Sequence, residues 1–193
     1  IPYRIYGGTS FYQRKEIKDV TAYLRLILNS ADEEALKRVI NFPGRGIGQT
    51  TIDRLVVVAN ETGKTIFGLL KEIDTITINI NNGTKNKLKD FVTLIESYQV
   101  LNQTANAFDL AEHVTKTSGL IREFNKDGTP EGVMRLENVE ELLNGIKDFV
   151  EGQLEIADSK DDLAEFLEDV ALATDLDGDK GDPNHVALMT IHS

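Results

Sequence analysis

The residues best suited to binding a ligand form a glycine-rich turn, Gly-Arg-Gly-Ile-Gly, at positions 44–48. Glycines let a backbone approach a phosphate closely, and the N–H groups that open a following helix point outward at its positive dipole end. Arginines add charge, while hydroxyl and amide side chains add neutral donors. The candidate contacts to a nucleic-acid backbone are Arg45, Gly46, Ile47, Gly48, Gln49, Thr50, Thr51 and Arg54.

Two predicted amphipathic helices position this turn. Ser30 and Glu33 have the spacing of a capping box, so we expect the first helix to begin there and to end near Pro43. The second helix is predicted to begin around 49–51. The arrangement resembles a helix-hairpin-helix DNA-binding element, which contacts backbone and not base edges and so binds independently of sequence. The alternative is a turn that merely joins two helices.

Around this unit the pattern predicts a helical body between two short strands. Apolar residues recur at helical spacing over 11–29, 65–73, 88–101, 108–119, 136–149 and 159–170. Polar loops are expected at 79–83, 125–132 and 175–183. Residues 3–6 and 186–191 have the character of strands. We expect these two strands to belong to one α/β unit into which the helices are inserted.

Other motifs lack a residue that their chemistry requires. Gly63-Lys64-Thr65 resembles the end of a phosphate-binding loop, but Val58 stands where that loop needs glycine. Asp175, Asp177 and Asp179 have calcium-loop spacing, without the glycine and glutamate that complete such a loop. His113 has no second metal ligand one turn away, and neighbouring carboxylates on a helix point apart. We therefore predict no catalytic residues, metal or cofactor in this chain.

The charge of the chain is unevenly distributed. The net charge is −11, which alone argues against binding a polyanion. Residues 1–54, however, carry a net charge of +3, and residues 131–182 carry −13. One end is therefore able to bind nucleic acid while the other faces solvent, although two solvated helix surfaces explain the same numbers. The chain has no cysteine and no apolar run of membrane-spanning length, and we expect a cytoplasmic location without membrane contact.

Five segments in the same order resemble superfamily 1 DNA helicases of the UvrD/Rep/PcrA type. Residues 3–25 resemble helicase motif IVa, and 38–48 resemble the accessory-domain element with the Gly-Ile-Gly turn. Residues 135–142 and 163–172 resemble later helices of that domain, called 2B. Residues 188–193 resemble the start of motif V. The sequence departs from the family pattern at Gly44, where a bulkier or basic residue is common.

The resemblance implies a mainly α fold, namely a helical 2B domain with the helix-hairpin-helix-like element and short terminal strands from a truncated RecA-like 2A domain. The implied bounds are 1–24 for a 2A flank, 25–182 for 2B and 183–193 for a second 2A flank. It implies a bacterial parent that unwinds DNA from 3′ to 5′, acts in pathways such as DNA repair, and requires ATP and Mg²⁺ bound outside this chain. The 2B part would hold duplex DNA at a single-strand/duplex junction and regulate unwinding.

The resemblance also implies partners and further contacts. The partners are DNA and helicase domains 1A, 1B and 2A, while Thr190 and His192 would contact single-stranded DNA in the intact parent. A second hypothesis is an autoregulatory protein-interaction module whose acidic half docks on the motor or on a basic partner. DNA binding that depends on the 46–48 turn distinguishes the first hypothesis from the second.

Overall fold

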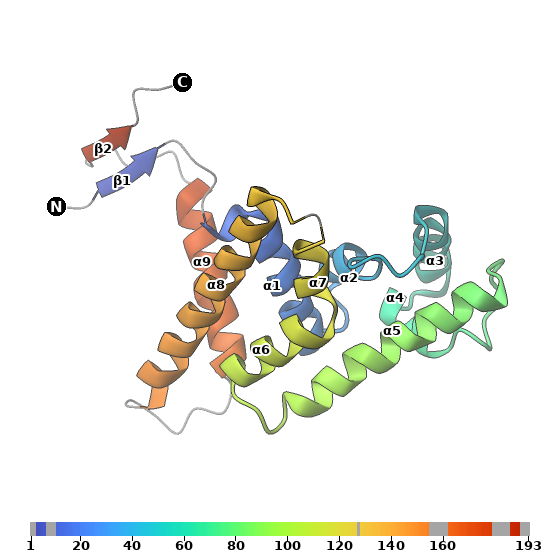
Figure 1. The fold of residues 1–193 in the computed structure, drawn as a ribbon. Coiled ribbons are helices and arrows are strands. Elements are labelled where there is room, and N and C mark those ends of the chain that lie inside the picture. Colours follow the sequence, from blue (N-terminus) through green and yellow to red (C-terminus); the bar gives the residue numbers. More distant parts are fainter. Residues whose placement is uncertain (1–2, 7–10, 127, 155–161, 179–185, 190–193) are drawn as a thin grey trace.

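The computed structural model describes residues 3–6, 11–126, 128–154, 162–178 and 186–189, and most of them are helical (Figure 1). The first helices are η1 (Phe11–Gln13), α1 (Lys15–Leu28), α2 (Glu33–Val39), α3 (Gln49–Thr62) and α4 (Ile66–Lys71). They are followed by α5 (Asn82–Leu101), α6 (Ala107–Thr117), α7 (Leu120–Phe124), α8 (Pro130–Leu154) and α9 (Asp162–Gly178). The predicted helical body is thus confirmed.

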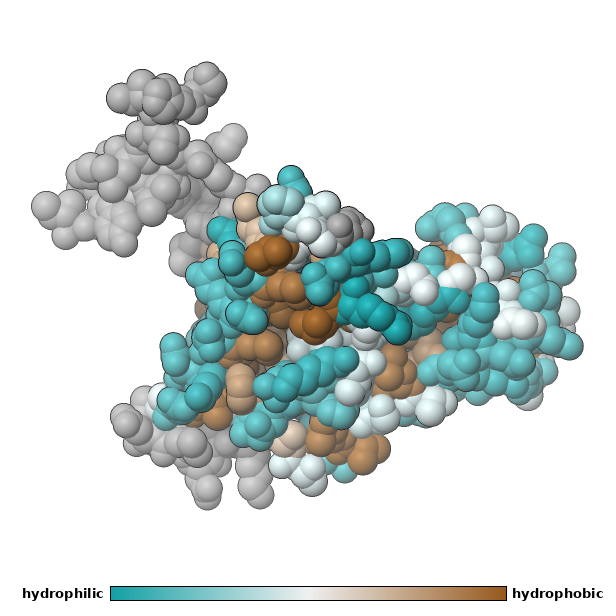
Figure 2. Space-filling view, viewed as in Figure 1, coloured by the Kyte–Doolittle hydropathy of each residue, from teal (hydrophilic) through white to brown (hydrophobic). Residues whose placement is uncertain are grey.

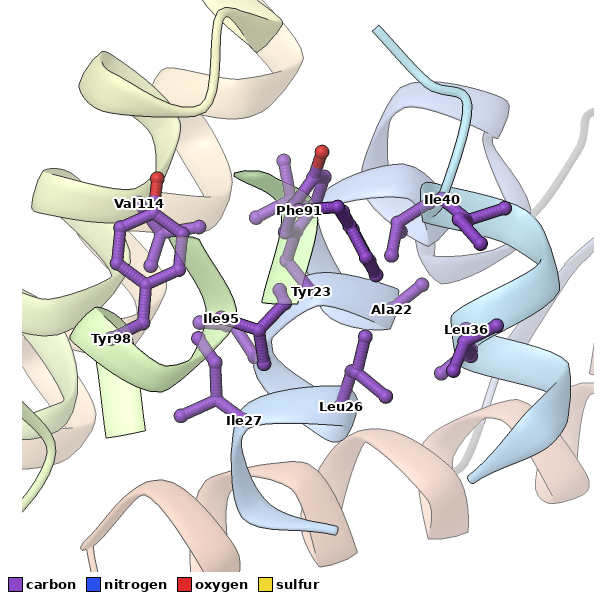
Figure 3. Close-up of a cluster of buried hydrophobic side chains, with 14 of the residues drawn as sticks. Ala22, Tyr23, Leu26, Ile27, Leu36, Ile40, Phe91, Ile95, Tyr98 and Val114 are labelled. Carbon is purple, nitrogen blue, oxygen red and sulfur yellow. The ribbon is translucent and has the colours of Figure 1, made fainter. Parts of the chain in front are cut away.

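Helix α1 lies at the centre of the core because its apolar residues occur on more than one side. Its Tyr23 and Leu26 are fully buried, and Figure 3 shows them among side chains of α2, α5 and α6. Leu36 from α2 and Phe91 from α5 pack around them, also without exposure or nearly so. Burying side chains of this size contributes about 1.5–3 kcal/mol each, so α1 organises the fold.

Helix α3 lies in a separate layer at the end of the molecule away from α8 and α9 (Figure 1). It packs on α4, which packs on α5, whereas α2 packs chiefly on α1. The expected helix-hairpin-helix-like element is therefore present only as a helix, a turn and a helix in sequence order, because its two helices pack mainly on other partners.

Side-chain caps fix several helix starts and correct some predicted boundaries. Asp32, and not the predicted Ser30, caps α2, since its carboxylate accepts from the N–H of Ala35 at 2.9 Å. Asn81 caps α5 in the same way, so the predicted loop at 79–83 ends two residues earlier. Asp175 and Asp177 lie within α9 and not in a loop, because this helix continues to Gly178.

The terminal β structure needs correction. The expected fold had short strands of a RecA-like 2A domain at both ends. Within the described residues, the strands are β1 (Tyr3–Tyr6) and β2 (Val186–Met189), which pair in parallel with each other. A two-stranded ladder has no core of its own, and the described residues between Phe11 and Gly178 contain no strand. The described chain is a helical protein, and a RecA-like α/β layer is not part of it.

Polar contacts join the first helix to α8. Asn138 of α8 accepts from the Arg14 guanidinium and donates to the Glu16 carboxylate, with both Asn138 and Glu16 buried. A buried amide that satisfies one cation and one anion fixes how two elements pack. The role of Arg14 and Glu16 visible here is therefore structural.

The structure places some of the motifs that the sequence analysis called incomplete. Gly63 ends α3 in a left-handed conformation with φ of 66°, and Thr65 caps α4, so a helix and not a strand precedes Gly63-Lys64-Thr65. The His113 ring packs edge-on against Tyr98. Within the described residues, no group of three His, Cys, Asp or Glu side chains is placed to hold a metal. No helix in that part of the chain is long and apolar enough to span a membrane.

Candidate nucleic-acid interface

The side chain of Asn41 holds the glycine-rich turn in place. Its Oδ1 accepts two backbone N–H groups, from Arg45 at 3.0 Å and from Ile47 at 2.9 Å. Gly46, between these two residues, has φ of 70°, a left-handed conformation that glycine adopts without strain. The Asn41 amide thus fixes the turn from inside, and it is bonded to the residues on either side of Gly46.

Arg45 is not available to a phosphate, which corrects its predicted role. Its guanidinium points inward and donates to the carbonyls of Val39 at 2.9 Å and Pro43 at 3.2 Å, and to the Tyr23 hydroxyl at 2.7 Å. It also lies against the rings of Tyr23 and Phe91. A guanidinium with these acceptors and aromatic faces is a structural group, so Arg45 ties the turn to the core.

Ile47 is likewise a core residue. Its side chain has no exposed surface, and its N–H is bonded to Asn41. A buried aliphatic side chain cannot contact DNA, so the predicted direct contact by Ile47 is wrong. Its place between two glycines serves to anchor the turn, which leaves the glycine backbone at the surface.

The start of α3 carries the unused hydrogen-bond donors. Gly48 is the N-cap residue and provides no side-chain cap, and its carbonyl accepts from the N–H groups of Thr51 at 2.9 Å and Ile52 at 3.4 Å. Among the described residues, the N–H groups of Gly46, Gly48, Gln49 and Thr50 have no acceptor. These four positions are exposed. The predicted contacts at these four residues therefore come together as a row of backbone donors at a positive helix end.

The side chains on the first turns of α3 differ in availability. Gln49 donates to the Asp53 carboxylate at 2.9 Å, and Thr51 is half-buried. Arg54 is exposed, but its guanidinium donates to the carbonyl of Asn79. Arg54 therefore has one of its five N–H groups engaged and others free. Thr190 and His192, predicted to contact a single strand, lie outside the described residues.

Lys87 is a residue of the site that the sequence did not reveal. It lies on α5, 41 positions after Gly46, and its Nζ is 3.2 Å from the Gly46 carbonyl. A Cβ on Gly46 would lie 2.6 Å from the same Nζ. The exposed ammonium group therefore stands beside the row of free N–H groups and supplies the charge that Arg45 does not. The sequence signal for this cation was the basic run Lys85-Asn86-Lys87-Leu88-Lys89. The run alone does not show that Lys87 lies at the turn, because its position depends on how α4 packs on α5.

The surface around the site agrees with a polar ligand. Figure 2 shows mostly hydrophilic residues over the lobe that holds α3 and the start of α5, while apolar residues gather over the middle of the helical body. The face of the lobe seen in this view is therefore suited to a polar ligand.

Comparison with known proteins adds the family to this geometry. The profile of the UvrD-like helicase C-terminal domain matches residues 1–193, the whole chain. The chain belongs to the UvrD-like helicase C-terminal domain family. The ATP-dependent DNA helicase PcrA of Staphylococcus aureus strain Mu50 is 34% identical over 194 residues, which is 100% of this chain and 26% of that protein. PcrA of Leuconostoc citreum shows the same identity and coverage.

This UvrD-like chain thus spans about a quarter of the length of the curated relatives that it matches. The match supports its relationship to ATP-dependent DNA helicases and the resemblance stated from sequence at the level of the family. The bounds of a 2B domain, and the role of the glycine-rich turn, are matters of proposal.

Proposed function

We propose that this chain provides a helical accessory domain, of the 2B type and spanning 25–182, which binds the backbone of duplex DNA for an ATP-dependent DNA helicase. The observation that carries the proposal is the row of four free N–H groups at Gly46, Gly48, Gln49 and Thr50. Backbone N–H groups at a helix start favour anions, and they contact phosphate without distinguishing bases. The family match supports DNA as the anion.

The proposed contacts are therefore mainly backbone groups with one added cation. Lys87 supplies a flexible ammonium group beside Gly46, and Arg54 and the Thr50 hydroxyl are available further along α3. Lysine acts as a point charge toward a phosphate, so its exact orientation matters less than its position at the turn. Weak, salt-dependent binding follows from few cations on a chain with a net charge of −11.

In the intact parent, this domain would hold the duplex at a single-strand/duplex junction and regulate unwinding. ATP and Mg²⁺ would be bound by parts of the parent outside this chain. The proposed partners within the parent are domains 1A, 1B and 2A, and Thr190 and His192 would add single-strand contacts there. The proposal assigns no catalytic residue to the chain itself.

The test is fluorescence anisotropy of the chain with a labelled duplex over a range of salt concentrations, in the wild type and in Lys87→Ala. Each phosphate contact by a cation contributes about 0.9 to the slope of log affinity against log salt. We therefore expect Lys87→Ala to bind more weakly at low salt and to reduce this slope by about one.

Lys116→Ala is the matched control, because it removes the same charge from the exposed surface of α6, where Lys116 pairs with Glu112. Its binding and slope should equal those of the wild type. Equal effects of the two substitutions would show only a general charge effect and would contradict a site at the turn. Absence of duplex binding at low salt would favour the protein-interaction hypothesis instead.

A further inference from the structure

The short helix α7 packs against the residues that lead into the glycine-rich turn. At the start of α7, a Cβ on Gly119 would lie 3.5 Å from Cγ of Pro43. At its end, the rings of Phe124 and Phe42 pack together with their centroids 6.0 Å apart. Contacts at both ends therefore fix α7 relative to the turn.

Arg122 lies between these two contacts, and its guanidinium stands beside the turn. The same Cβ position on Gly119 is 3.6 Å from Arg122 Nη2, so this nitrogen and Pro43 both lie within 4 Å of one point. Arg122 is exposed. From α5, the Lys87 ammonium approaches the turn at the Gly46 carbonyl. Two cations from separate helices thus stand at different residues of the turn.

The guanidinium of Arg122 has no hydrogen bond or ion pair within the described residues. The adjacent carboxylate of Glu123 pairs with Lys126 instead, at 3.5 Å. Most other arginines between residues 11 and 178 donate to a protein group, namely Arg14, Arg25, Arg38, Arg45 and Arg54. In a chain with a net charge of −11, an exposed arginine that leaves its five donors unused is suited to an external anion.

We propose that Arg122 binds a second phosphate group of DNA at the Pro43 side of the turn, while Lys87 and the free N–H groups bind the first. The inference rests on the proposed DNA-binding function and extends it from one backbone contact to two. A guanidinium suits this role because its planar donors match two phosphate oxygens. Figure 2 shows hydrophilic surface between the apolar middle of the helical body and the lobe that holds α3, which favours a polyanion over an apolar protein segment.

The separation of the two cations is set by the helical body. Helices α5 and α7, which carry Lys87 and Arg122, both pack on α6. A bound strand must therefore present two phosphate groups at this separation. Because the two cations lie on different helices and share no partner within the described residues, their contributions to binding should add.

The test is fluorescence anisotropy of the chain with a labelled duplex over a range of salt concentrations, in Arg122→Gln, in Lys87→Ala and in the double variant. Glutamine removes the charge and keeps a polar side chain. We expect Arg122→Gln to lower the slope of log affinity against log salt by about one, and the double variant to lower it by about two. Arg122→Lys keeps the charge and should keep the wild-type slope.

Lys18→Gln is the matched control. Lys18 also has no ion pair in the part of the chain that the structure describes, but it lies in a pocket lined by α1, α2 and α9. Its slope should equal that of the wild type, and an equal loss in Lys18→Gln and Arg122→Gln would overturn the proposal as a general charge effect.

The outcomes also separate this inference from the proposed function. A slope that falls in Lys87→Ala and is unchanged in Arg122→Gln would leave the proposed function standing and overturn the second contact alone. Absence of duplex binding by the wild type at low salt would overturn both.

Discussion

The Arg45 guanidinium donates to the Tyr23 hydroxyl over 2.7 Å, and this contact directs the one arginine of the glycine-rich turn into the protein. The Tyr23 hydroxyl in turn donates to the carbonyl of Phe42 at 2.7 Å. Tyr23 of the central helix α1 therefore holds both the turn, through Arg45, and Phe42 before it. What remains for a ligand outside is the glycine backbone, the start of α3 and Lys87.

Replacing Arg45 by alanine should reduce stability more than DNA affinity. The substitution removes charged hydrogen bonds to Val39 and Tyr23, and such bonds contribute about 1.5–3 kcal/mol each when their partners are left buried. We expect the free energy of unfolding in urea to fall by about 3 kcal/mol or more. Under conditions where the variant is folded, the salt slope of duplex binding should not change.

Arg54→Ala serves as the comparison, because its guanidinium is exposed and contacts one carbonyl. It should change stability by about 0.5 kcal/mol or less. An unchanged stability of Arg45→Ala, together with a salt slope lower by about one, would contradict the inward role assigned to Arg45.

Tyr23 should remain neutral well into the alkaline range. Burial raises the pKa of Tyr23 to about 12, and the nearby Arg45 only partly opposes this. Because the folded pKa lies above the unfolded value of about 10, Tyr23 contributes stability that is present below pH 10 and is lost as the pH rises toward 12. Burial also raises the pKa of Tyr98, so ultraviolet titration should show more than one delayed tyrosine. The component that ionises last should be absent in Tyr23→Phe.

Asp19 should make stability depend on pH in the acidic range. Burial raises the pKa of Asp19 above its ordinary value, so the folded state favours the protonated form. The contribution is fully present below the unfolded pKa and is lost as the pH rises through the folded pKa. Relative to Asp19→Asn, the wild type should therefore gain unfolding free energy as the pH falls through this window. A constant difference between the two proteins across that window would contradict the raised pKa.

The sequence was sufficient for the features that depend on local periodicity. Helices such as α1 and α8 carry apolar residues at helical spacing, and Pro43 with the glycines after it marks the turn that follows Phe42. The observed helix bounds differ from the predicted ones where two side chains could cap the same helix. For α2, Asp32 is the N-cap residue instead of the predicted Ser30. The resemblance in sequence gave the family, because several weak segments occurred in the right order.

The same reasoning failed where a role depends on tertiary contacts. Arg45 looked like a phosphate ligand by type and position, but the buried Tyr23 and two carbonyls provide a better partner set inside. Lys87 was not among the predicted contacts, because only the layer of α3, α4 and α5 brings it to Gly46. The spacing of residue types along the sequence does not show which way a side chain in a turn points. Nor does it show which residues 41 positions apart are in contact.

A serine in place of Gly48 should stabilise the protein and weaken DNA binding. Gly48 has ordinary helix-cap angles, φ −75° and ψ 157°, and a Cβ there would meet nothing within 4 Å. Serine caps a helix slightly better than glycine, by a few tenths of a kcal/mol, but its hydroxyl would occupy the N–H groups proposed for phosphate. Gly48→Ala is the matched control, because alanine is a poor cap yet leaves those N–H groups free.

Thermal unfolding should therefore rank serine above glycine above alanine, while duplex affinity by anisotropy should be lowest for serine and nearly equal for glycine and alanine. If affinity followed the stability ranking instead, the open start of α3 would have no role in binding.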